Sequence, residues 1–391
     1  RTDALVPPGA GLTMPVYLDH NATTHLNPRV FESMQPYLSG PAANASSLHR
    51  YGRIARDAVE QARLQVAQLV GCEAREIIWT SGGTESNNLA LKGIADGPAS
   101  AAGASVLYGA TDHPAVMEAA ESLAGRGVRV APVAVDADGL IDAAALVTQL
   151  SLAPVTLVSI MRANNETGVI QDIAPLALQV HRHGALLHVD AVQAAGKIGV
   201  DIAALDCDLL SLSSHKIYGP KGAAALVVRG HVDLSALQHG GAQERGLRGG
   251  TENVAAIVGF GAAAELAMAE LDARARHAQA LRERLQSGLQ ARGDVLVFGG
   301  GAPRRLPNTL QFAVRGWDGE ALLMALDRKG FAVSSGSACA SGSGEPSHVL
   351  LAMGHDRDTA KGAIRVSFGR SNTADQVDGF LQALQQITRS A

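Results

Sequence analysis

The stretch that decides the fold is Leu210-Ser211-Leu212-Ser213-Ser214-His215-Lys216-Ile217-Tyr218-Gly219-Pro220-Lys221-Gly222. An apolar run ends in it, small polar residues follow, and the pair His215-Lys216 stands just before a glycine-rich turn. A lysine at such a point lies at the mouth of a sheet, where its amine can form a Schiff base with an aldehyde cofactor. The alternative is a solvated surface lysine, so the interpretation depends on the rest of the chain.

Seven short apolar runs alternate with amphipathic helical patterns over the first two thirds of the chain. The predicted strands are Glu76–Thr80, Ser105–Ala110, Val128–Val133, Val155–Met161, Ala185–Val189, Asp208–Leu212 and Ala223–Val228. The helical patterns between them include Ala55–Leu69, Ala115–Ala124 and Ile173–His183. This alternation predicts an α/β fold with a mainly parallel seven-stranded sheet covered by helices. Ligands bind such sheets at the carboxyl ends of the strands.

A long helical pattern from Val254 to Gln290 predicts a linker helix into a second domain. The predicted division is a loose N-terminal segment over residues 1–13, a large domain over 14–258 and a smaller α+β domain over 259–391. The predicted elements of the smaller domain are Pro307–Val314, Gly319–Lys329, Phe331–Val333 and Ala363–Ile387. A chain of 391 residues is long enough to bury two cores.

The composition excludes several classes of protein. Hydrophobic residues make up 47% of the chain and charged residues 18%, which is not the composition of a disordered protein. The net charge of -4 gives no reason to expect nucleic acid or an anionic membrane as a partner, and no apolar run reaches the length of a membrane span. Three cysteines without CxxC spacing argue against a disulfide framework and, with no signal sequence visible, favour the cytoplasm.

Polar residues follow other predicted strands, and each has two interpretations. Gly83 and Thr84 open a helix, where backbone N–H groups and the helix N-terminus suit a phosphate. The alternative is that the turn only caps the helix. His113, placed before Pro114, can stack on a planar ring or carry a proton, or it can lie satisfied in a loop.

The remaining strand ends extend this set. Asn164-Asn165 could contact a ring hydroxyl or a substrate, or could equally make Asx turns. Asp190 ends an apolar strand, where a buried carboxylate needs a cationic partner. A protonated pyridine nitrogen is such a partner, as in the electron-sink chemistry of pyridoxal 5'-phosphate (PLP), whereas capping of the next helix is the alternative. Ser213 and His215 then provide groups that could hold a phosphate beside Lys216.

Two further residues carry chemical interest near the C-terminal end. Cys339 lies in Ser334–Gly344, a Ser/Gly-rich run whose composition favours exposure and mobility. A thiol in such a run is typical of a nucleophile or a carrier, whereas Cys72 and Cys207 stand in contexts typical of packed cysteines. Arg365 offers a bidentate fork for a carboxylate, and the alternative is an exposed structural ion pair.

Together these segments resemble the cysteine desulfurases of the NifS/IscS type, within the class V aminotransferase-like PLP enzymes of fold type I. The resemblance extends from Val16 to Arg370, and the motifs that carry it are SGGTESNNLALKG, ANNETG, HVDAVQAAGK, SHKIYGPKG, GTEN and SSGSAC. The segment 345–350 resembles the NifS/IscS subgroup rather than the SufS subgroup. The small departures remove no group that the chemistry needs, and they lie at Asp19-His20-Asn21, Arg162 and Gly249-Gly250.

The resemblance implies how a cofactor would be held. Lys216 would carry PLP as a Schiff base, with Asp190 at the pyridine nitrogen and Gln193 facing the ring hydroxyl. His113 would stack on the ring and assist proton transfers, and Asn165 would contact the cofactor. The phosphate would be bound by Gly83, Thr84, Ser213, His215 and, from the neighbouring subunit of a homodimer, Thr251.

The resemblance also implies a reaction. PLP-dependent removal of sulfur from L-cysteine would give L-alanine and a persulfide on Cys339, with Asn165 and Arg365 holding the substrate carboxylate. Lys216 would remove the Cα proton, and His113 is the candidate base for the Cys339 thiol. The sulfur would pass to an acceptor protein such as an iron–sulfur scaffold, and no metal site is implied.

Three alternatives stay open. A selenocysteine lyase would use the same groups, and another class V PLP enzyme, such as an aminotransferase, would share the scaffold. An aminotransferase needs no second nucleophile, which argues for Cys339 as a working group. A non-catalytic sulfur carrier has no use for Lys216 together with Asp190. The short stretch after the last helical pattern leaves the acceptor undecided and favours a NifS-like protein.

Overall fold

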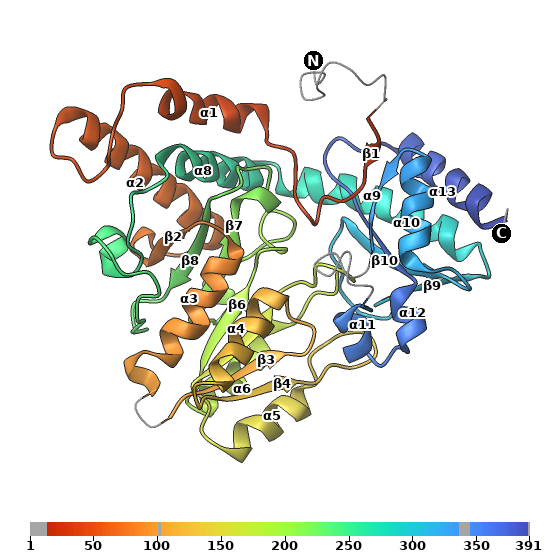
Figure 1. Cartoon of the computed structure of the whole chain (residues 1–391), viewed down its shortest axis with the longest axis horizontal. Helices are drawn as coiled ribbons and strands as arrows, with labels where there is room; N and C mark the ends of the chain where they lie inside the picture. The colour runs from red at the N-terminus through yellow and green to blue at the C-terminus, as the bar shows by residue number, and fades with distance from the viewer. Residues whose placement is uncertain (1–13, 101–102, 336–344, 390–391) are drawn as a thin grey trace.

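The computed structural model of the chain describes residues 14–100, 103–335 and 345–389. The predicted loose segment 1–13 and the predicted nucleophile Cys339 lie outside the described residues. Figure 1 shows a larger lobe built around one sheet, on the left of the view, and a smaller lobe with β9, β10, α10 and α13 on the right.

The large sheet has seven strands in the order β2-β8-β7-β6-β5-β3-β4. The strands are β2 Ile77–Thr80, β3 Ser105–Gly109, β4 Arg129–Val133, β5 Leu157–Met161, β6 Leu186–Asp190, β7 Leu209–Ser213 and β8 Ala224–Val228. Only β8 runs against its neighbours, β2 and β7, and the other pairs are parallel. The prediction of a mainly parallel seven-stranded sheet is therefore confirmed, with every strand within two residues of its predicted bounds.

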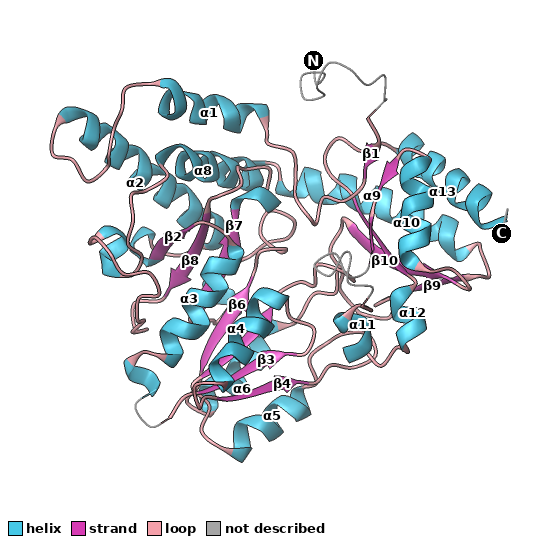
Figure 2. Ribbon diagram, in the orientation of Figure 1, coloured by secondary structure: helices cyan, strands magenta, loops and turns pink. Residues whose placement is uncertain are grey.

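Both faces of this sheet are apolar, and its strands alternate between two cores. In β2, Ile77 and Trp79 pack into one core and Ile78 into the other. The first core is covered by α1 Pro28–Ser39, α2 Arg50–Val70, α5 Ala143–Leu152, α6 Ile173–Arg182, α7 Ile202–Leu205 and α8 Val254–Ala269. The second is covered by α3 Gly83–Ala95 and α4 Pro114–Ala124, which Figure 2 shows in front of the strands. Burial on both faces explains why the strands are short continuous apolar runs.

The predicted single linker helix is wrong, because the chain bends there. The helices α8 and α9 (Leu271–Gln290) meet at 73° at Glu270. Phe260 of α8 is buried in the large lobe, whereas Leu285 of α9 packs in the smaller lobe, so each helix serves a different core. Among the described residues no single helix is long and apolar enough to cross a membrane, although this bent pair passes that test by length and composition together.

The smaller lobe is built on an antiparallel sheet of order β12-β13-β10-β9 and a parallel pair β1-β11. Its strands are β1 Val16–Tyr17, β9 Val295–Val297, β10 Thr309–Val314, β11 Phe331–Ala332, β12 Ser334–Ser335 and β13 Ala363–Ser367. Its helices are α10 Gly319–Arg328, α11 His348–Ala352, α12 Arg357–Lys361 and α13 Ala374–Arg389. Leu18 packs in its core, so both ends of the described chain build this lobe. The division at residue 258 stays a prediction.

Candidate active site

The polar residues singled out in the sequence follow strands that point the same way. Because β2, β3, β5, β6 and β7 are mutually parallel through the sheet, their carboxyl ends lie along one edge. The residues that follow them are Ser81–Thr84, His113, Asn164-Asn165, Asp190 and Lys216. The fold therefore gathers these residues at one edge of the sheet.

Lys216 lies in a 3-10 turn, Ser214–Lys216, directly after β7. Its amine donates to two backbone carbonyls, to Asn21 O at 2.5 Å and Ala22 O at 2.8 Å. Tyr218 has a φ of 72°, a conformation that non-glycine residues rarely adopt and that costs on the order of 1–3 kcal/mol. The lysine therefore sits in a turn whose geometry the surrounding contacts impose, and its amine meets oxygens brought from the start of the chain.

Asp190 ends β6 and is 5% exposed. Its Oδ2 accepts from Asn87 Nδ2 at 2.7 Å, and its Oδ1 accepts from the backbone N–H of Val192 at 2.9 Å. The alternative, capping of the next helix, does not hold as stated, because the bond to Val192 closes a turn at residues 192–194 and no helix begins there. The bond from Asn87 comes from α3. Asp190 is thus a fixed, buried carboxylate whose charge is held by two donors.

His113 caps α4, and this contact sets its tautomer. Its Nδ1 accepts from the backbone N–H of Ala115 at 3.0 Å, so a neutral ring carries its proton on Nε2. Burial lowers the pKa of His113, and the charge of Lys216 lowers it further, while Asp190 opposes both. The neutral ring presents an N–H at Nε2, so the role of base suggested for it toward Cys339 requires that Nδ1 give up its bond to Ala115.

The region between the end of β7 and the start of α3 is suited to binding an anion the size of a phosphate. The Ser213 Oγ is buried and has no hydrogen-bond partner among the described residues. A Cβ on Gly83 would lie 2.9 Å from a methyl carbon of Val192 and 3.8 Å from the Cβ of Ser213, so only glycine brings the start of α3 this close. Thr84 is exposed in the first turn of the same helix. A buried hydroxyl without a partner, beside a helix N-terminus, is typical of an anion-binding site.

His215 extends the same region, but its ring is turned to another part of the chain. Its Nδ1 lies 3.1 Å from Thr23 Oγ1, and its carbonyl accepts from Thr24. Burial, followed by the charges of Lys216 and Lys221, lowers the pKa of His215 to about 4. At neutral pH it is therefore a neutral hydrogen-bonding group.

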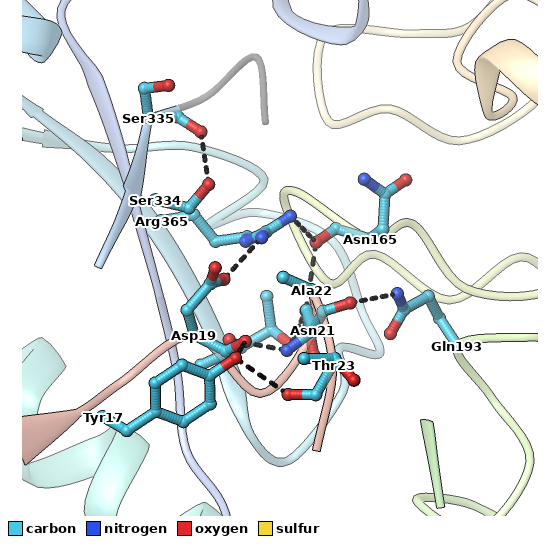
Figure 3. A network of polar contacts seen from close by, with 12 residues as sticks. Tyr17, Asp19, Asn21, Ala22, Thr23, Asn165, Gln193, Ser334, Ser335 and Arg365 are labelled. Atoms are coloured by element: carbon cyan, nitrogen blue, oxygen red, sulfur yellow. Dashed lines mark hydrogen bonds and ion pairs between the residues drawn. The ribbon is translucent and has the colours of Figure 1, made fainter. Parts of the chain in front are cut away.

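Asn21 forms hydrogen bonds with residues of both lobes and with Lys216. Figure 3 shows it beside Gln193 and Asn165. Its carbonyl accepts from Gln193 Nε2 at 2.9 Å in addition to Lys216. Its side-chain Nδ2 donates to Asn165 O at 3.0 Å and to Thr309 Oγ1 at 2.8 Å. Every polar group of Asn21 is used, so it fixes Gln193 and Asn165 relative to Lys216.

Arg365 is buried, at 1% exposure, so the interpretation as an exposed ion pair is wrong. It is nonetheless paired: its Nη2 contacts Asp19 Oδ1 at 2.6 Å and its Nη1 donates to Asn165 O at 3.1 Å. Figure 3 shows the guanidinium between Asp19 and Asn165. Its Nε has no partner among the described residues, which leaves one donor direction for a ligand.

The two asparagines of the ANNETG loop differ in role. Asn164 makes an Asx turn, because its Oδ1 accepts from the N–H groups of Glu166 and Thr167 at 2.8 and 3.0 Å. Asn165 meets Asn21 and Arg365 through its carbonyl oxygen. The interpretation as an Asx turn is therefore correct for Asn164, whereas Asn165 lies among the site residues.

The described residues on either side of 336–344 both attach to this site. On one side, Ser334 of β12 pairs with Arg365 of β13. On the other, Ser347 Oγ donates to the buried Glu166 Oε2 at 2.6 Å, and His348 Nε2 lies 2.9 Å from the carbonyl of Asp112, the residue before His113. Cys339 itself lies outside the described residues.

Thr251 is the one predicted cofactor residue that stands apart. It is exposed on the loop between a 3-10 turn at Gln243–Gly246 and α8, and within the described residues no hydrogen bond joins it to the residues above. The neighbouring Glu252 lines a hollow of about 830 Å³. The other residues lining this hollow include Arg56, Glu60, Arg63, Arg75, Glu244 and Arg245.

Comparison with known proteins agrees with this geometry. The aminotransferase class-V family matches residues 16–380. A cysteine desulfurase IscS from Anaeromyxobacter dehalogenans is 47% identical over 371 residues, which are 94% of this chain and 91% of that protein. The chain belongs to the class-V aminotransferase family, among its IscS- and NifS-like members. The family depends on PLP.

Solved structures extend the likeness to the fold. A NifS-like protein from Rickettsia africae matches with a TM-score of 0.87 at 35% identity, over 96% of this chain and 99% of that one. A structure described as SspA in complex with cysteine matches with a TM-score of 0.79 at 32% identity, over 91% and 99% of the two chains. PLP fold type I is therefore the architecture of this family member.

Several residues of the site carried no assigned role in the sequence. Asn87 stands in SGGTESNN and Lys197 closes HVDAVQAAGK, so both lie inside quoted motifs. In the sequence Asn21 is notable only as a departure from the family pattern, and Glu166 and Ser347 only as members of the loop segments that contain them. Their partners are far away in the chain, and no local pattern identifies such a partner.

Proposed function

We propose that this chain is a cysteine desulfurase that takes sulfur from L-cysteine, releases L-alanine and holds the sulfur as a persulfide on Cys339. The observation that carries the proposal is the meeting of Lys216, Asp190 and His113 at one edge of the sheet, with one flank of the cysteine segment paired to Arg365 and the other bonded to Glu166. The cysteine named in the SspA complex supports the same substrate class.

The residues fit PLP, because the buried orphaned hydroxyl of Ser213 lies beside the start of α3. Lys216 would hold the cofactor covalently, and Asp190 would pair with its ring nitrogen. Gly83, Thr84, Ser213 and His215 would bind the phosphate, and Gln193 would face the ring hydroxyl. When bound, PLP would supply an electron sink for the charge that develops at the substrate Cα.

The residues of the chain would then divide the proton and sulfur transfers. Asn165 and Arg365 would hold the substrate carboxylate, with the guanidinium already fixed by Asp19. Lys216 would take the Cα proton as a base. Cys339 would attack the substrate sulfur as a thiolate, so that an S–S bond forms while the substrate C–S bond breaks and its electron pair stays on the substrate carbon.

Two protons complete L-alanine: Lys216 would return the one that it took from Cα, and the second would be the proton of the Cys339 thiol, carried by His113 as the candidate base. To take that proton the ring would release the Ala115 N–H from Nδ1, because Nε2 already carries a hydrogen in the neutral form. The Cys339 thiol needs such a base because a thiol titrates at about 8.5.

A homodimer would complete the site, with Thr251 reaching the phosphate of the neighbouring subunit. The exposure of Thr251 and the hollow beside Glu252 support this arrangement, because each would be covered by a second copy. An acceptor protein, such as an iron–sulfur scaffold, would then take up the sulfur. We place the reaction in the cytoplasm, where unpaired cysteines such as Cys72 and Cys207 stay reduced.

The test measures alanine and sulfide from L-cysteine in the presence of a reductant, in the wild type, Cys339→Ala and the matched control Cys72→Ala. The wild type and the control should be active, and Cys339→Ala should keep the visible band of the bound cofactor but lose activity by at least about a hundred-fold. Normal turnover by Cys339→Ala would refute the role of Cys339. A PLP-loaded wild type that acts on L-selenocysteine but not on L-cysteine would make the chain a selenocysteine lyase.

A further inference from the structure

Lys197 is a buried lysine to which the chemistry above gives no task. It is 9% exposed, and among the described residues no carboxylate pairs with it. Its amine donates to two amide oxygens, Gln193 Oε1 at 2.5 Å and Asn21 Oδ1 at 2.8 Å. Burial, with Lys216 and Arg365 nearby, lowers its pKa well below the ordinary value. Placing an amine here is costly, and an apolar side chain would fill the same space more cheaply.

The backbone between Gln193 and Lys197 places the Lys197 amine beside the Gln193 amide. Backbone bonds from Ala195 to Ala191 and from Ile198 to Ala194 close two successive turns, and Lys197 comes back to Gln193, four residues earlier. Gly196 has a φ of 70°, and a Cβ there would lie 2.6 Å from a methyl carbon of Ile217. The turn that carries Lys197 is therefore packed tightly against the residue that follows Lys216.

The two contacts of the Gln193 amide fix which way it faces. Its oxygen is occupied by Lys197 and its nitrogen donates to Asn21 O, so a flipped amide would place N–H against an amine and oxygen against a carbonyl. The amide nitrogen keeps a second hydrogen for another acceptor. This orientation holds whether the lysine is charged or neutral, because in both cases a flipped amide would place its oxygen against the Asn21 carbonyl.

We propose that Lys197 is a positioning residue that locks the Gln193 amide with its N–H side toward the phenolic oxygen of the cofactor. The inference rests on the proposed function, in which Gln193 faces the ring hydroxyl of PLP. A fixed donor at that oxygen stabilises the more anionic, deprotonated form of the bound cofactor. Lys197 thereby sets the pH range over which the cofactor holds its proton, without touching the cofactor.

The experiment titrates the visible absorbance of the PLP-loaded protein with pH, in the absence of substrate. Lys197→Met removes the donor and keeps the length of the side chain, and the midpoint should rise by about one pH unit. The matched control is Lys221→Met, which removes an exposed lysine that also lies close enough to influence His215. Its midpoint should stay within about 0.2 of the wild type, because Lys221 does not contact Gln193.

A double variant distinguishes whether Lys197 acts by positioning Gln193 or only through its own charge. Gln193→Leu should raise the midpoint as Lys197→Met does, and the two changes together should add nothing to Gln193→Leu. Additive shifts would overturn the positioning role and assign Lys197 an electrostatic one. An unchanged midpoint in Gln193→Leu would overturn the proposal even if Lys197→Met fails to fold. A wild type that takes up no PLP would instead refute the proposed function, so the two failures are distinguishable.

Discussion

The Ser347 hydroxyl donates to Glu166 Oε2 at 2.6 Å, and this bond ties the chain after residue 344 to the loop that holds Asn165. Glu166 is buried, and burial raises its pKa, although Ser347, His348 and Gln311 all favour its charged form. Gln311 Nε2 also donates to Glu166 Oε2, at 3.1 Å. A buried carboxylate in this place depends on its donors.

Removal of the Ser347 hydroxyl should therefore destabilise the protein and slow sulfur transfer. Ser347→Ala loses the bond to Glu166 and the N-cap of α11, where Ser347 Oγ accepts from Leu350 N at 3.2 Å. We expect a loss of about 1–3 kcal/mol in the free energy of unfolding, measured with denaturant. Ser151→Ala is the control, because that exposed helical serine bonds only its own helix. Equal stability of the two variants would contradict the prediction.

Asn87 should be needed for cofactor affinity, although it lies behind Asp190. Asn87→Leu leaves Asp190 Oδ2 without its donor at 2.7 Å, so the carboxylate is no longer held toward the ring nitrogen. We expect PLP to bind the stripped protein about ten-fold more weakly, measured by titration of absorbance. Asn88→Leu, which loses only a bond to Thr84 O, should bind PLP nearly as the wild type does. Affinity that is equally low in both variants would show a general defect of α3.

His188 should make the protein sensitive to acid. It is fully buried between Ser159 Oγ and Ser211 Oγ, each at 2.9 Å, and burial lowers its pKa to about 4. Between pH 6.5 and 4 the unfolded chain binds a proton at His188 that the folded chain does not. The free energy of unfolding therefore falls as pH is lowered through this window, by up to about 3 kcal/mol from this residue.

The measurement for His188 is the denaturation midpoint from pH 7 to pH 4.5. His188→Gln can still bond both serines but cannot titrate, so its stability should fall less steeply as the pH is lowered. His183→Asn, at an exposed position, should keep the slope of the wild type. A His188→Gln variant with an unchanged slope would assign the acid sensitivity to other groups.

Cys72 and Cys207 should resist alkylation in the folded protein. Burial, with Glu76 nearby, raises the pKa of the Cys72 thiol to about 12, and burial raises that of Cys207 as well. Because the thiolate is the reactive form, iodoacetamide at pH 7.5 should leave both unlabelled in Cys339→Ala, as followed by intact mass. Both should react after unfolding in denaturant. Labelling of folded Cys339→Ala would show that one of them is reactive.

Much of the fold can be predicted from the sequence, because the patterns that indicate each strand are local. Each strand of the large sheet is a short apolar run bounded by turns, so all seven were predicted within two residues. The break at Glu270 was missed because the helical pattern continues through it, while the two helices turn their apolar faces to different cores. The pairing of β1 with β11 was missed because two residues carry no periodicity.

The sequence by itself determined the positions of the strands along the chain and the type of residue at each carboxyl end, including Lys216 and Asp190. It did so because a polar residue directly after an apolar run is placed by the strand before it. The tertiary structure decided which groups those residues meet. Asn21 reaches Lys216, and Asn87 reaches Asp190, across 195 and 103 positions of the chain. Only packing of the sheet, its helices and the second lobe brings such distant donors and acceptors within hydrogen-bonding distance.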